Sequence, residues 1–374
     1  MHEVDPAIQA TIQECLPAHL PGSPTVVAVD PVRRPESNHP GVWVARTDDG
    51  TRVVVKHQIF APLTRGEPHD LLRAEERVCR MLSDTGCPVA RVYGVDPTHS
   101  LVFSEWCGKL TLDDVCQESD EASVRAWGKQ VVEGFCGTQG VLRDRTPDLA
   151  DVSFPECDRQ GLLEIWSQTV LGIGSQVGEL VSWLNPGTSS RTTARVEMLW
   201  NELVEALADA PSLLGPTDYN ARNIVINTST QEARFIEFAK LGWDWPERRL
   251  VQYTASMGSG RGDGGFRSAL DQNQAAAYGS LADWSGGDPE TAARRLDAHH
   301  VVFHVLAGLR LQRALLHPAE ENNRQVLAAW RNPQRRAREL SALLGQPLSS
   351  DSLVTELRTL LGGSGSGGPD ATCA

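Results

Sequence analysis

Two stretches decide how this chain folds: PTDYNARNIVI at residues 216–226 and ARFIEF at residues 233–238. Each contains an apolar run typical of a β-strand, and the short segment STQ lies between the runs. The pattern therefore predicts a β-hairpin. Polar residues stand at its mouth: Asn223 opens the first strand, Asp218 precedes Asn223 by five residues, and Glu237 lies near the end of the second strand.

The register of this hairpin determines which of these side chains meet. A turn centred near Thr230 places residue 223 opposite residue 237, so Asn223 and Glu237 are expected to lie side by side. An amide oxygen beside a carboxylate suits Mg²⁺, which uses few protein ligands and takes the others from phosphates. Asp218, on the preceding loop, is placed to orient or deprotonate an attacking hydroxyl. A DxxxxN spacing alone is a weak signal, which the hairpin and the second carboxylate strengthen.

A further hairpin is predicted at residues 42–57, where VWVARTDDGTRVVVKH places an Asp-Asp-Gly turn between two alternating strands. In its second strand Val53 and Val55 point to one face, whereas Val54 and Lys56 point to the other. A lysine that closes an apolar strand is costly to bury without an anion. Lys56 is therefore expected to meet a carboxylate or a phosphate.

The partner expected for Lys56 is Glu75, which lies on a helix predicted for residues 71–86, with Glu76 as its rival. A Lys–Glu pair that holds nucleotide phosphates is a feature of kinases. The hairpin also brings the loop SNHPG at 37–41 back towards Lys56. Backbone N–H groups in this loop are candidates to cover phosphates, at Ser37, Asn38 and Gly41.

The chain is predicted to form a two-lobed α+β fold, with a small β-rich lobe followed by a larger, mainly helical one. In the small lobe, a helix at 6–16 and strands at 89–95 and 100–106 accompany the hairpin. The further helices are expected at 120–137, 160–183, 192–209, 272–283, 290–316 and 319–345. The glycine-dense segment SMGSGRGDGGFRS, 256–268, is expected to be a mobile loop. Ligands favour the cleft between two such lobes.

Composition excludes several classes of protein. The chain has 374 residues, 40% of them hydrophobic, and a formal net charge of −13. A negative balance of this size argues against nucleic acid or an anionic membrane as the main partner, because either demands a basic surface. The eight cysteines form no CxxC pair and are interpreted as reduced thiols, and no apolar run is long enough for a membrane span. We therefore expect a cytoplasmic protein.

Taken together, these motifs resemble the aminoglycoside phosphotransferase and choline kinase-like family, a branch of the protein-kinase-like fold. The likeness covers about residues 36–255 and extends more loosely to 345. ESNHPGVWVARTDDGTRVVVKH resembles the phosphate loop and lysine strand of the family, and RAEERVCRML its αC helix. SLVFSEWCGKLTLDD resembles the hinge, LGPTDYNARNIVI the HGDxxxxN loop, and FIEFAKLGWDWPERRL the IDFxxxGxxxxPxxDL segment.

The resemblance implies a role for each matching residue. Asp218 corresponds to the catalytic base, Asn223 and Glu237 to the ligands of Mg²⁺, and Lys56 with Glu75 to the pair that holds the α- and β-phosphates of ATP or GTP. The backbone of the hinge would meet the adenine edge, at Glu105, Trp106 and Cys107. The implied domains are a nucleotide-binding lobe at 1–106, a catalytic and substrate lobe at 107–350, and a disordered tail at 361–374.

Three positions depart from the family pattern. Pro216 stands where the family has a histidine that supports the catalytic loop, and proline supplies no donor. Glu237 replaces the metal-binding aspartate and adds a methylene. Arg249 replaces an aspartate that braces the same loop. The site therefore keeps its charged groups but has lost parts of their support.

Three functions remain open on the sequence. The first is transfer of the γ-phosphoryl group to a hydroxyl of a small molecule such as a sugar, a nucleoside or an antibiotic-like metabolite. Because Lys240 stands where many relatives carry aspartate, a polycationic aminoglycoside ranks below neutral acceptors. The second is phosphorylation of Ser/Thr in a peptide of natural-product biosynthesis. The third is a pseudokinase that binds a protein partner, which the substitutions at Pro216, Glu237 and Arg249 motivate.

Two further patterns are given structural interpretations. His300 and His304 have i, i+4 spacing and His299 adjoins them, but no carboxylate or cysteine motif accompanies them. Packing is therefore favoured over a zinc site. The RGD at 261–263 is interpreted as a chance occurrence of this tripeptide within the glycine-dense segment.

Overall fold

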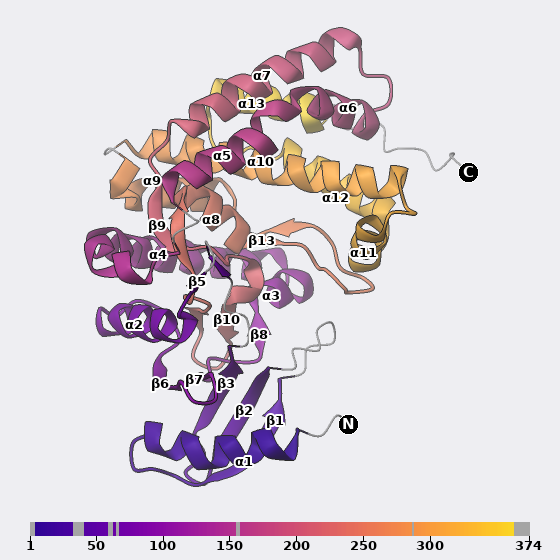
Figure 1. Cartoon of the computed structure of the whole chain (residues 1–374). Helices are drawn as coiled ribbons and strands as arrows, with labels where there is room; N and C mark the ends of the chain where they lie inside the picture. Colours follow the sequence, from indigo (N-terminus) through magenta and orange to yellow (C-terminus); the bar gives the residue numbers. More distant parts are fainter. Residues whose placement is uncertain are drawn as a thin grey trace.

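The computed structural model of this chain describes residues 4–32, 41–58, 63–64, 67–154, 158–285 and 288–362. They form two unequal parts, the small lobe at the bottom of Figure 1 and the larger helical lobe above it. The two-lobed α+β architecture expected from the sequence is confirmed. Ser37 and Asn38, and the tail from residue 363, lie outside the described residues.

The small lobe is built on an antiparallel five-stranded sheet with the strand order β1-β2-β3-β7-β6. Its strands are β1 (Val26–Pro31), β2 (Val42–Thr47), β3 (Arg52–His57), β6 (Val92–Asp96) and β7 (Leu101–Glu105). The short strands β4 (Leu63–Thr64) and β5 (Glu67–Pro68) pair with each other apart from it. The predicted hairpin at 42–57 is confirmed as β2–β3, whereas β1 was not predicted.

One helix accompanies each face of this sheet. The helix α1 (Pro6–Cys15) begins at Asp5, whose side chain accepts a hydrogen bond from the backbone of Ala7, and continues into the 3₁₀ helix η1 (Leu16–His19). Ile12 of α1 packs in one buried cluster with Val53 and Val55 of β3. The opposite face carries Lys56 and lies towards α2 (Leu71–Asp84), as the alternation of β3 predicts.

Chain segments from the hinge tie the small lobe to the large one. After β7 the chain enters β8 (Leu110–Thr111), which pairs with β10 (Ile224–Asn227), and β10 in turn pairs with β11 (Glu232–Phe235). A further two-stranded sheet joins β9 (Leu213–Pro216) to β12 (Leu241–Asp244). The catalytic-loop candidate therefore lies between two small sheets, after β9 and before β10.

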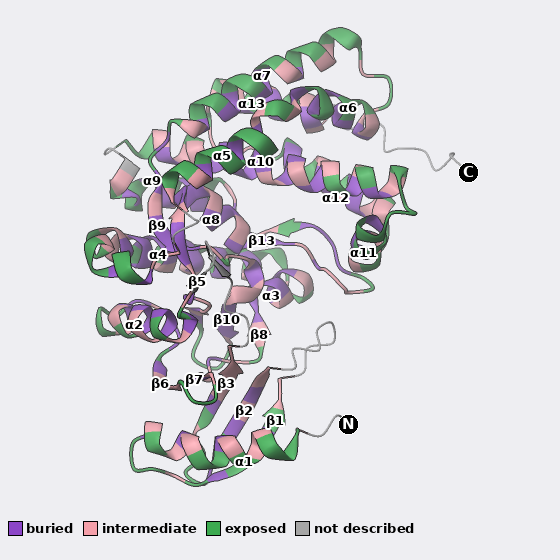
Figure 2. Cartoon of the chain, in the orientation of Figure 1, coloured by how far each residue is buried: buried purple, intermediate pink, exposed green. Residues whose placement is uncertain are grey.

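Helices make up the rest of the large lobe. They are α3 (Leu112–Glu118), α4 (Glu121–Asp144), η2 (Thr146–Val152), α5 (Arg159–Thr169), η3 (Leu171–Ile173), α6 (Gly174–Leu184), α7 (Ser190–Ala208), η4 (Ala221–Asn223), α8 (Pro246–Thr254), α9 (Gln272–Leu281), η5 (Asp283–Ser285), α10 (Pro289–Leu316), α11 (Glu321–Ala329), α12 (Pro333–Gly345) and α13 (Ser352–Gly362). The strands β13 (Ala255–Ser256) and β14 (Arg267–Ser268) pair across the glycine-dense segment. The buried residues concentrate along α10, which lies between the other helices in Figure 2.

Several predicted boundaries were wrong. The helix predicted at 160–183 is two helices, α5 and α6, with the 3₁₀ helix η3 between them. The helix predicted at 319–345 is also two, because Asn332 adopts a left-handed conformation (φ 55°) before Pro333. The helical lobe does not end at 350, since α13 continues to Gly362, which includes two residues assigned to the tail.

Candidate active site

The catalytic-loop candidate runs from the end of β9 to the start of β10. Asn223 donates from its side-chain nitrogen to the backbone oxygen of Asp218 at 2.8 Å and to the carboxylate of Asp218 at 3.3 Å. Asn220 accepts a hydrogen bond from the backbone of Arg222 and thereby begins the short helix η4. The loop thus holds Asp218 and Asn223 in contact, which the sequence analysis did not predict.

The predicted register of the β10–β11 hairpin is wrong by one residue. Ile224 pairs with Phe235, and the backbone of Ile236 donates to Asn223 at 3.0 Å, so residue 236, not 237, faces Asn223. The turn contains four residues, 228–231, and its centre therefore falls between Ser229 and Thr230. Glu237 lies just beyond the strand.

Glu237 has an unusual backbone conformation. Its φ is 70°, in the left-handed region that non-glycine residues seldom adopt. Conformations of this kind persist only where the surrounding structure enforces them, and they concentrate at functional sites. The left-handed residue turns the chain at the end of β11 and directs the Glu237 carboxylate to Lys56.

Lys56 joins the two lobes through two carboxylates. Its ammonium lies 3.6 Å from Glu75 of α2 and 2.5 Å from Glu237 of the large lobe. Burial opposes the charge of Lys56, but the attraction of Glu75 and Glu237 outweighs it and raises the pKa of the ammonium. The sequence predicted the contact with Glu75 but missed the direct contact with Glu237, because the latter depends on how the lobes close.

Glu75 is the buried member of this cluster, with 7% of its surface exposed. Burial raises the pKa of Glu75, while the charge of Lys56 opposes that rise. Gln58, which the sequence did not single out, donates to the Glu75 carboxylate at 2.5 Å. The rival Glu76 instead pairs with Arg80 on the surface of α2.

The hinge residue Cys107 belongs to a small apolar cluster. Cys107 packs with Ala90 of the small lobe and with Val225 and Ile236 of the large lobe. Its thiol donates to the backbone oxygen of Glu105 at 3.6 Å, and burial, aided by the Glu105 charge, raises the pKa of Cys107 to about 12. Trp106, the third hinge residue predicted from the resemblance, is partly exposed.

The phosphate loop is described only at its end. Gly41 accepts a hydrogen bond from the backbone of His57 at 2.7 Å, and the next residue, Val42, pairs with Lys56 across the hairpin. The return of this loop to Lys56 is therefore confirmed at Gly41.

Arg249 supports the catalytic loop from beneath. Its guanidinium is fully buried and donates to the backbone oxygens of Pro216 (3.0 Å), Leu213 (2.8 Å) and Gly242 (2.7 Å), and to the side chain of Gln139 (3.0 Å). Burial lowers the pKa of Arg249. The expectation that Arg249 leaves the loop unsupported is wrong: the arginine holds the backbone before Asp218 from below, with Pro216 as acceptor and not donor.

The residue after Asp218 is anchored to the end of β12. The Tyr219 hydroxyl donates to Asp244, which also forms an ion pair with Arg248 at 3.2 Å. Burial, followed by the Asp244 charge, raises the pKa of Tyr219. Tyr219 and Arg249 therefore fix the catalytic loop on both sides of Asp218.

The glycine-dense segment is anchored rather than mobile, so this prediction was wrong. Its backbone oxygens accept from Arg336 at Met257 and Gly258, and the Gln117 side chain bonds both Ser256 (2.7 Å) and Gly265 (2.9 Å). Gly258 adopts a φ of 48°, and a Cβ there would lie 2.8 Å from the backbone nitrogen of Gly265. Local composition cannot show this anchoring, because the partners come from distant helices.

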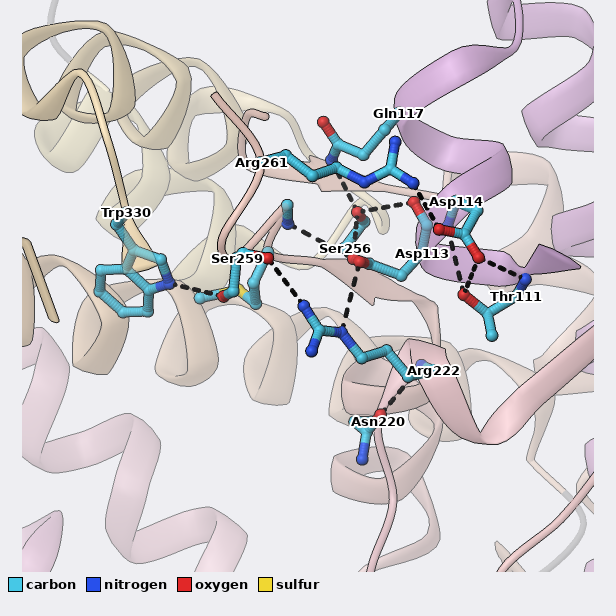
Figure 3. Close-up of polar contacts among 12 residues, drawn as sticks. Thr111, Asp113, Asp114, Gln117, Asn220, Arg222, Ser256, Ser259, Arg261 and Trp330 are labelled. Carbon is cyan, nitrogen blue, oxygen red and sulfur yellow. Dashed lines mark hydrogen bonds and ion pairs between the residues drawn. The ribbon is translucent and has the colours of Figure 1, made fainter. Parts of the chain in front are cut away.

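The same segment contacts the catalytic loop (Figure 3). Arg222 donates to the backbone oxygen of Ser259 at 2.9 Å and lies 3.6 Å from Asp113 of α3. The Ser259 hydroxyl accepts from the indole nitrogen of Trp330 at 3.0 Å, and Arg261 pairs with Asp114. The sequence analysis missed this network, which connects the loop of Asp218 with the C-terminal helices.

At the lobe junction, Asn223 and Glu237 offer two ligand groups for a divalent cation, but Lys56 already contacts one of them. Asn223 uses its amide nitrogen towards Asp218, which leaves the amide oxygen as a ligand, and Glu237 provides a carboxylate. Lys56 already holds one oxygen of this carboxylate. An amide oxygen and a carboxylate are the ligands that Mg²⁺ prefers, with phosphates as the remaining ligands.

The three histidines of α10 are buried, as the packing interpretation predicted. His304 donates from Nδ1 to the backbone oxygen of His300 (2.8 Å), and the His300 ring contacts Arg358 at 3.0 Å. His299 packs against the rings of both Trp166 and Trp245, at centroid distances of 5.8 and 5.6 Å. All five fully described interior thiols are reduced and buried, at Cys79, Cys87, Cys107, Cys116 and Cys136.

Comparison with known proteins finds similarity in fold but not in sequence. No protein-family model matches the chain, and no curated protein matches its sequence. A choline/ethanolamine kinase family protein from Mesorhizobium loti has a TM-score of 0.48 at 13% identity over 95% of this chain and 98% of its own. The macrolide 2'-phosphotransferase of Brachybacterium faecium has a TM-score of 0.47 at 14% identity, over 86% and 98%.

An aminoglycoside phosphotransferase from Streptomyces rimosus, solved with ADP and streptomycin, has a TM-score of 0.36 at 15% identity, over 71% of this chain and 90% of its own. These neighbours come from the families that the motifs resemble. Among the described residues, none of the helices combines the length and the apolar character that a membrane crossing requires.

Proposed function

We propose that this protein is an ATP-dependent phosphotransferase that moves the γ-phosphoryl group to a hydroxyl of a small molecule. The observation that carries the proposal is the position of Lys56, which contacts Glu75 and Glu237 at 3.6 and 2.5 Å at the junction of the lobes. Asp218 and Asn223 lie in contact on the loop nearby. A cation, two carboxylates and an Asp–Asn pair are the groups that phosphoryl transfer requires.

Each residue of the candidate site has its own role in the proposed transfer. Lys56 neutralises nucleotide phosphates, and Asn223 with Glu237 would hold Mg²⁺, which supplies further positive charge when bound. Asp218 accepts the proton of the acceptor hydroxyl. The hydroxyl oxygen forms a new bond to the γ-phosphorus while the bond from that phosphorus to the bridging oxygen breaks, and a nucleoside diphosphate leaves. Arg249 and Tyr219 fix the loop, so that Asp218 needs little rearrangement.

A binding subunit without activity is the second candidate. The observation that favours it is the direct ion pair between Lys56 and Glu237, which occupies the carboxylate that the metal needs. In an active enzyme the nucleotide and Mg²⁺ must separate this pair. In a pseudokinase it would stay closed.

A thermal-shift titration with ATP and GTP, each with and without Mg²⁺, separates the two candidates. A ligand at about 100 times its Kd adds about 2.7 kcal/mol of stability, which raises the melting temperature visibly. For a phosphotransferase we expect a Mg²⁺-dependent shift with ATP that disappears in Glu237→Ala. The exposed Glu232→Ala is the matched control, because it removes a carboxylate from the same hairpin. No shift with either nucleotide would refute the enzyme and favour the binding subunit.

A further inference from the structure

A cavity of about 260 Å³ lies in the helical lobe beyond the catalytic loop. Residues from α5, α8, α10 and the end of α11 line it, together with Met257 of the glycine-dense segment. The side chains that matter for recognition are Trp166, Arg248, Gln252, His299, Arg310 and Trp330. The volume is somewhat below the roughly 300–1,000 Å³ of drug-sized ligand sites, so it fits a molecule of one or two rings.

Hydrogen bonds and an ion pair connect two sides of the cavity to the loop that contains Asp218. Arg248 pairs with Asp244, which accepts from the hydroxyl of Tyr219, the residue that follows Asp218. On the other side, Trp330 donates to Ser259, whose backbone oxygen accepts from Arg222, the residue before Asn223 (Figure 3). The walls are therefore fixed relative to the two ends of the Asp218 loop.

The unsatisfied ring nitrogens of His299 indicate that this cavity binds a ligand. The side chain has 2% of its surface exposed, and neither ring nitrogen has a hydrogen-bond partner within the described part of the chain. Burial, followed by the charges of Arg248 and Arg295, lowers the pKa of His299 well below its usual value, so the ring is neutral. A neutral imidazole offers one donor and one acceptor, and leaving both unmet when buried is unfavourable. A polar group of a bound molecule would satisfy it.

The charges around the cavity determine what it accepts. Two guanidinium groups line it, Arg248 and Arg310, and no aspartate or glutamate does. Asp244 neutralises Arg248, whereas Arg310 lies exposed at 5.6 Å over the ring of Trp330. A cationic molecule would meet no counter-charge on these walls, and an anionic one would meet Arg310.

We propose that this cavity binds the acceptor, and that the acceptor combines a planar or aromatic body with an anionic group such as a carboxylate. The proposal rests on the proposed phosphotransferase function, which it deepens by naming the acceptor class. Trp166 and Trp330 contact the planar body, Arg310 attracts the anion at the mouth, and His299 bonds a polar group inside. A polycationic acceptor is excluded on the same grounds.

Aromatic rings also attract cations, so a quaternary or primary ammonium is the competing occupant. Two features oppose it. Arg310 already covers Trp330, and an ammonium would have to displace or repel that guanidinium. No carboxylate of the described residues lines the cavity to attract an ammonium, since Asp244, which neutralises Arg248, is not among the lining residues.

Isothermal titration without nucleotide tests the proposal with three matched phenols: 3-hydroxybenzoate, 3-hydroxybenzyl alcohol and 3-hydroxybenzylamine. They share one ring and one phenolic hydroxyl, and the substituent meta to this hydroxyl carries an anion, a neutral alcohol or a cation. We expect the acid to bind about tenfold more tightly than the amine, because a single partly exposed charge contributes on that scale. Arg310→Ala should reduce this preference to about threefold or less, and His299→Phe should weaken all three.

The matched control is Arg313→Ala, which removes another exposed arginine of α10 that pairs with Glu320 outside the cavity. It should leave the preference unchanged. The proposal is overturned if the amine binds as tightly as the acid, if Arg310→Ala leaves the preference intact, or if none of the three probes binds at millimolar concentration. Arg310 is exposed, so Arg310→Ala is expected to fold. This variant therefore tests the anion preference even if His299→Phe does not fold.

Addition of Mg²⁺ and ATP to the bound acid then separates the two proposals. Phosphorus NMR that detects a phosphate ester supports both. Binding of the acid with the expected Arg310 dependence but without transfer keeps the cavity as an anion-selective site and refutes the phosphotransferase. Transfer to 3-hydroxybenzylamine in preference to the acid keeps the phosphotransferase and refutes the acceptor class.

Discussion

Replacement of Arg249 by methionine tests whether this buried guanidinium supports the catalytic loop. Arg249 donates to three backbone oxygens and to Gln139, at 2.7–3.0 Å. Methionine fills much of the same volume but donates to none of them. The acceptors belong to β9, β12 and α4, so the substitution removes the bonds that hold these elements together beneath Asp218.

The magnitude follows from the number of bonds and the cost of burying the charge. A hydrogen bond from a charged donor contributes about 1.5–3 kcal/mol, and four of them are not additive. Arg249→Met also removes the desolvation penalty of a buried guanidinium, which is several kcal/mol. Because the buried acceptors stay behind without donors, at about 1–3 kcal/mol each, we expect a net loss of about 3–5 kcal/mol in the free energy of unfolding. That is a large fraction of the roughly 5–15 kcal/mol that stabilise a typical domain.

Urea denaturation measures this loss. Tryptophan fluorescence and circular dichroism should be followed together, because coincident transitions justify a single free energy of unfolding. The control is Arg294→Met on α10, whose guanidinium is 51% exposed and lies 3.8 Å from Asp351, and which should change stability by less than about 0.5 kcal/mol. A loss below about 1 kcal/mol for Arg249→Met would refute the bracing role.

Two further predictions concern catalysis and pH. Asp218→Asn should lower turnover by about 10²–10⁴-fold with an unchanged melting temperature, and equal turnover in both proteins would refute its role as base. Burial lowers the pKa of His304 to about 4, so the unfolded chain takes up a proton near pH 6.5 that the folded chain resists. Stability should therefore be complete above pH 6.5 and fall towards pH 4, by about 2 kcal/mol at pH 5 for this group. In urea denaturation measured at a series of pH values, His304→Gln should reduce this loss of stability towards pH 4. The same substitution at the exposed His317 should leave the loss unchanged.

Local patterns determined much of the small lobe. The alternation in β3 placed Val53 and Val55 against α1 and Lys56 on the other face, because a strand presents successive side chains to opposite faces. The helix of Glu75 was also predictable, since its apolar residues recur at helical spacing. The strand β1 was missed, because VVAVD shows no strong alternation of apolar and polar residues.

Boundaries in the helical lobe were less predictable. The break between α11 and α12 depends on Asn332 and Pro333, which stand in a pattern that otherwise continues. The register of the β10–β11 hairpin depends on the length of its turn, and a shift of one residue moves Glu237 out of the strand. Tertiary contacts decide the helix break and the hairpin register, and the local sequence pattern does not show these contacts.

The sequence by itself determined which polar and charged groups the candidate site contains: the charged Lys56, Glu75, Asp218 and Glu237, and the amide of Asn223. Residue type and spacing suffice for this, because phosphoryl transfer needs few kinds of side chain at characteristic separations. The tertiary structure alone decided how they are supported. Arg249 contacts Pro216 across 33 positions and Arg222 contacts Ser259 across 37, distances along the chain at which no local pattern is informative. The buried His299 and its cavity follow for the same reason, since burial is a property of packing between helices and not of any one segment.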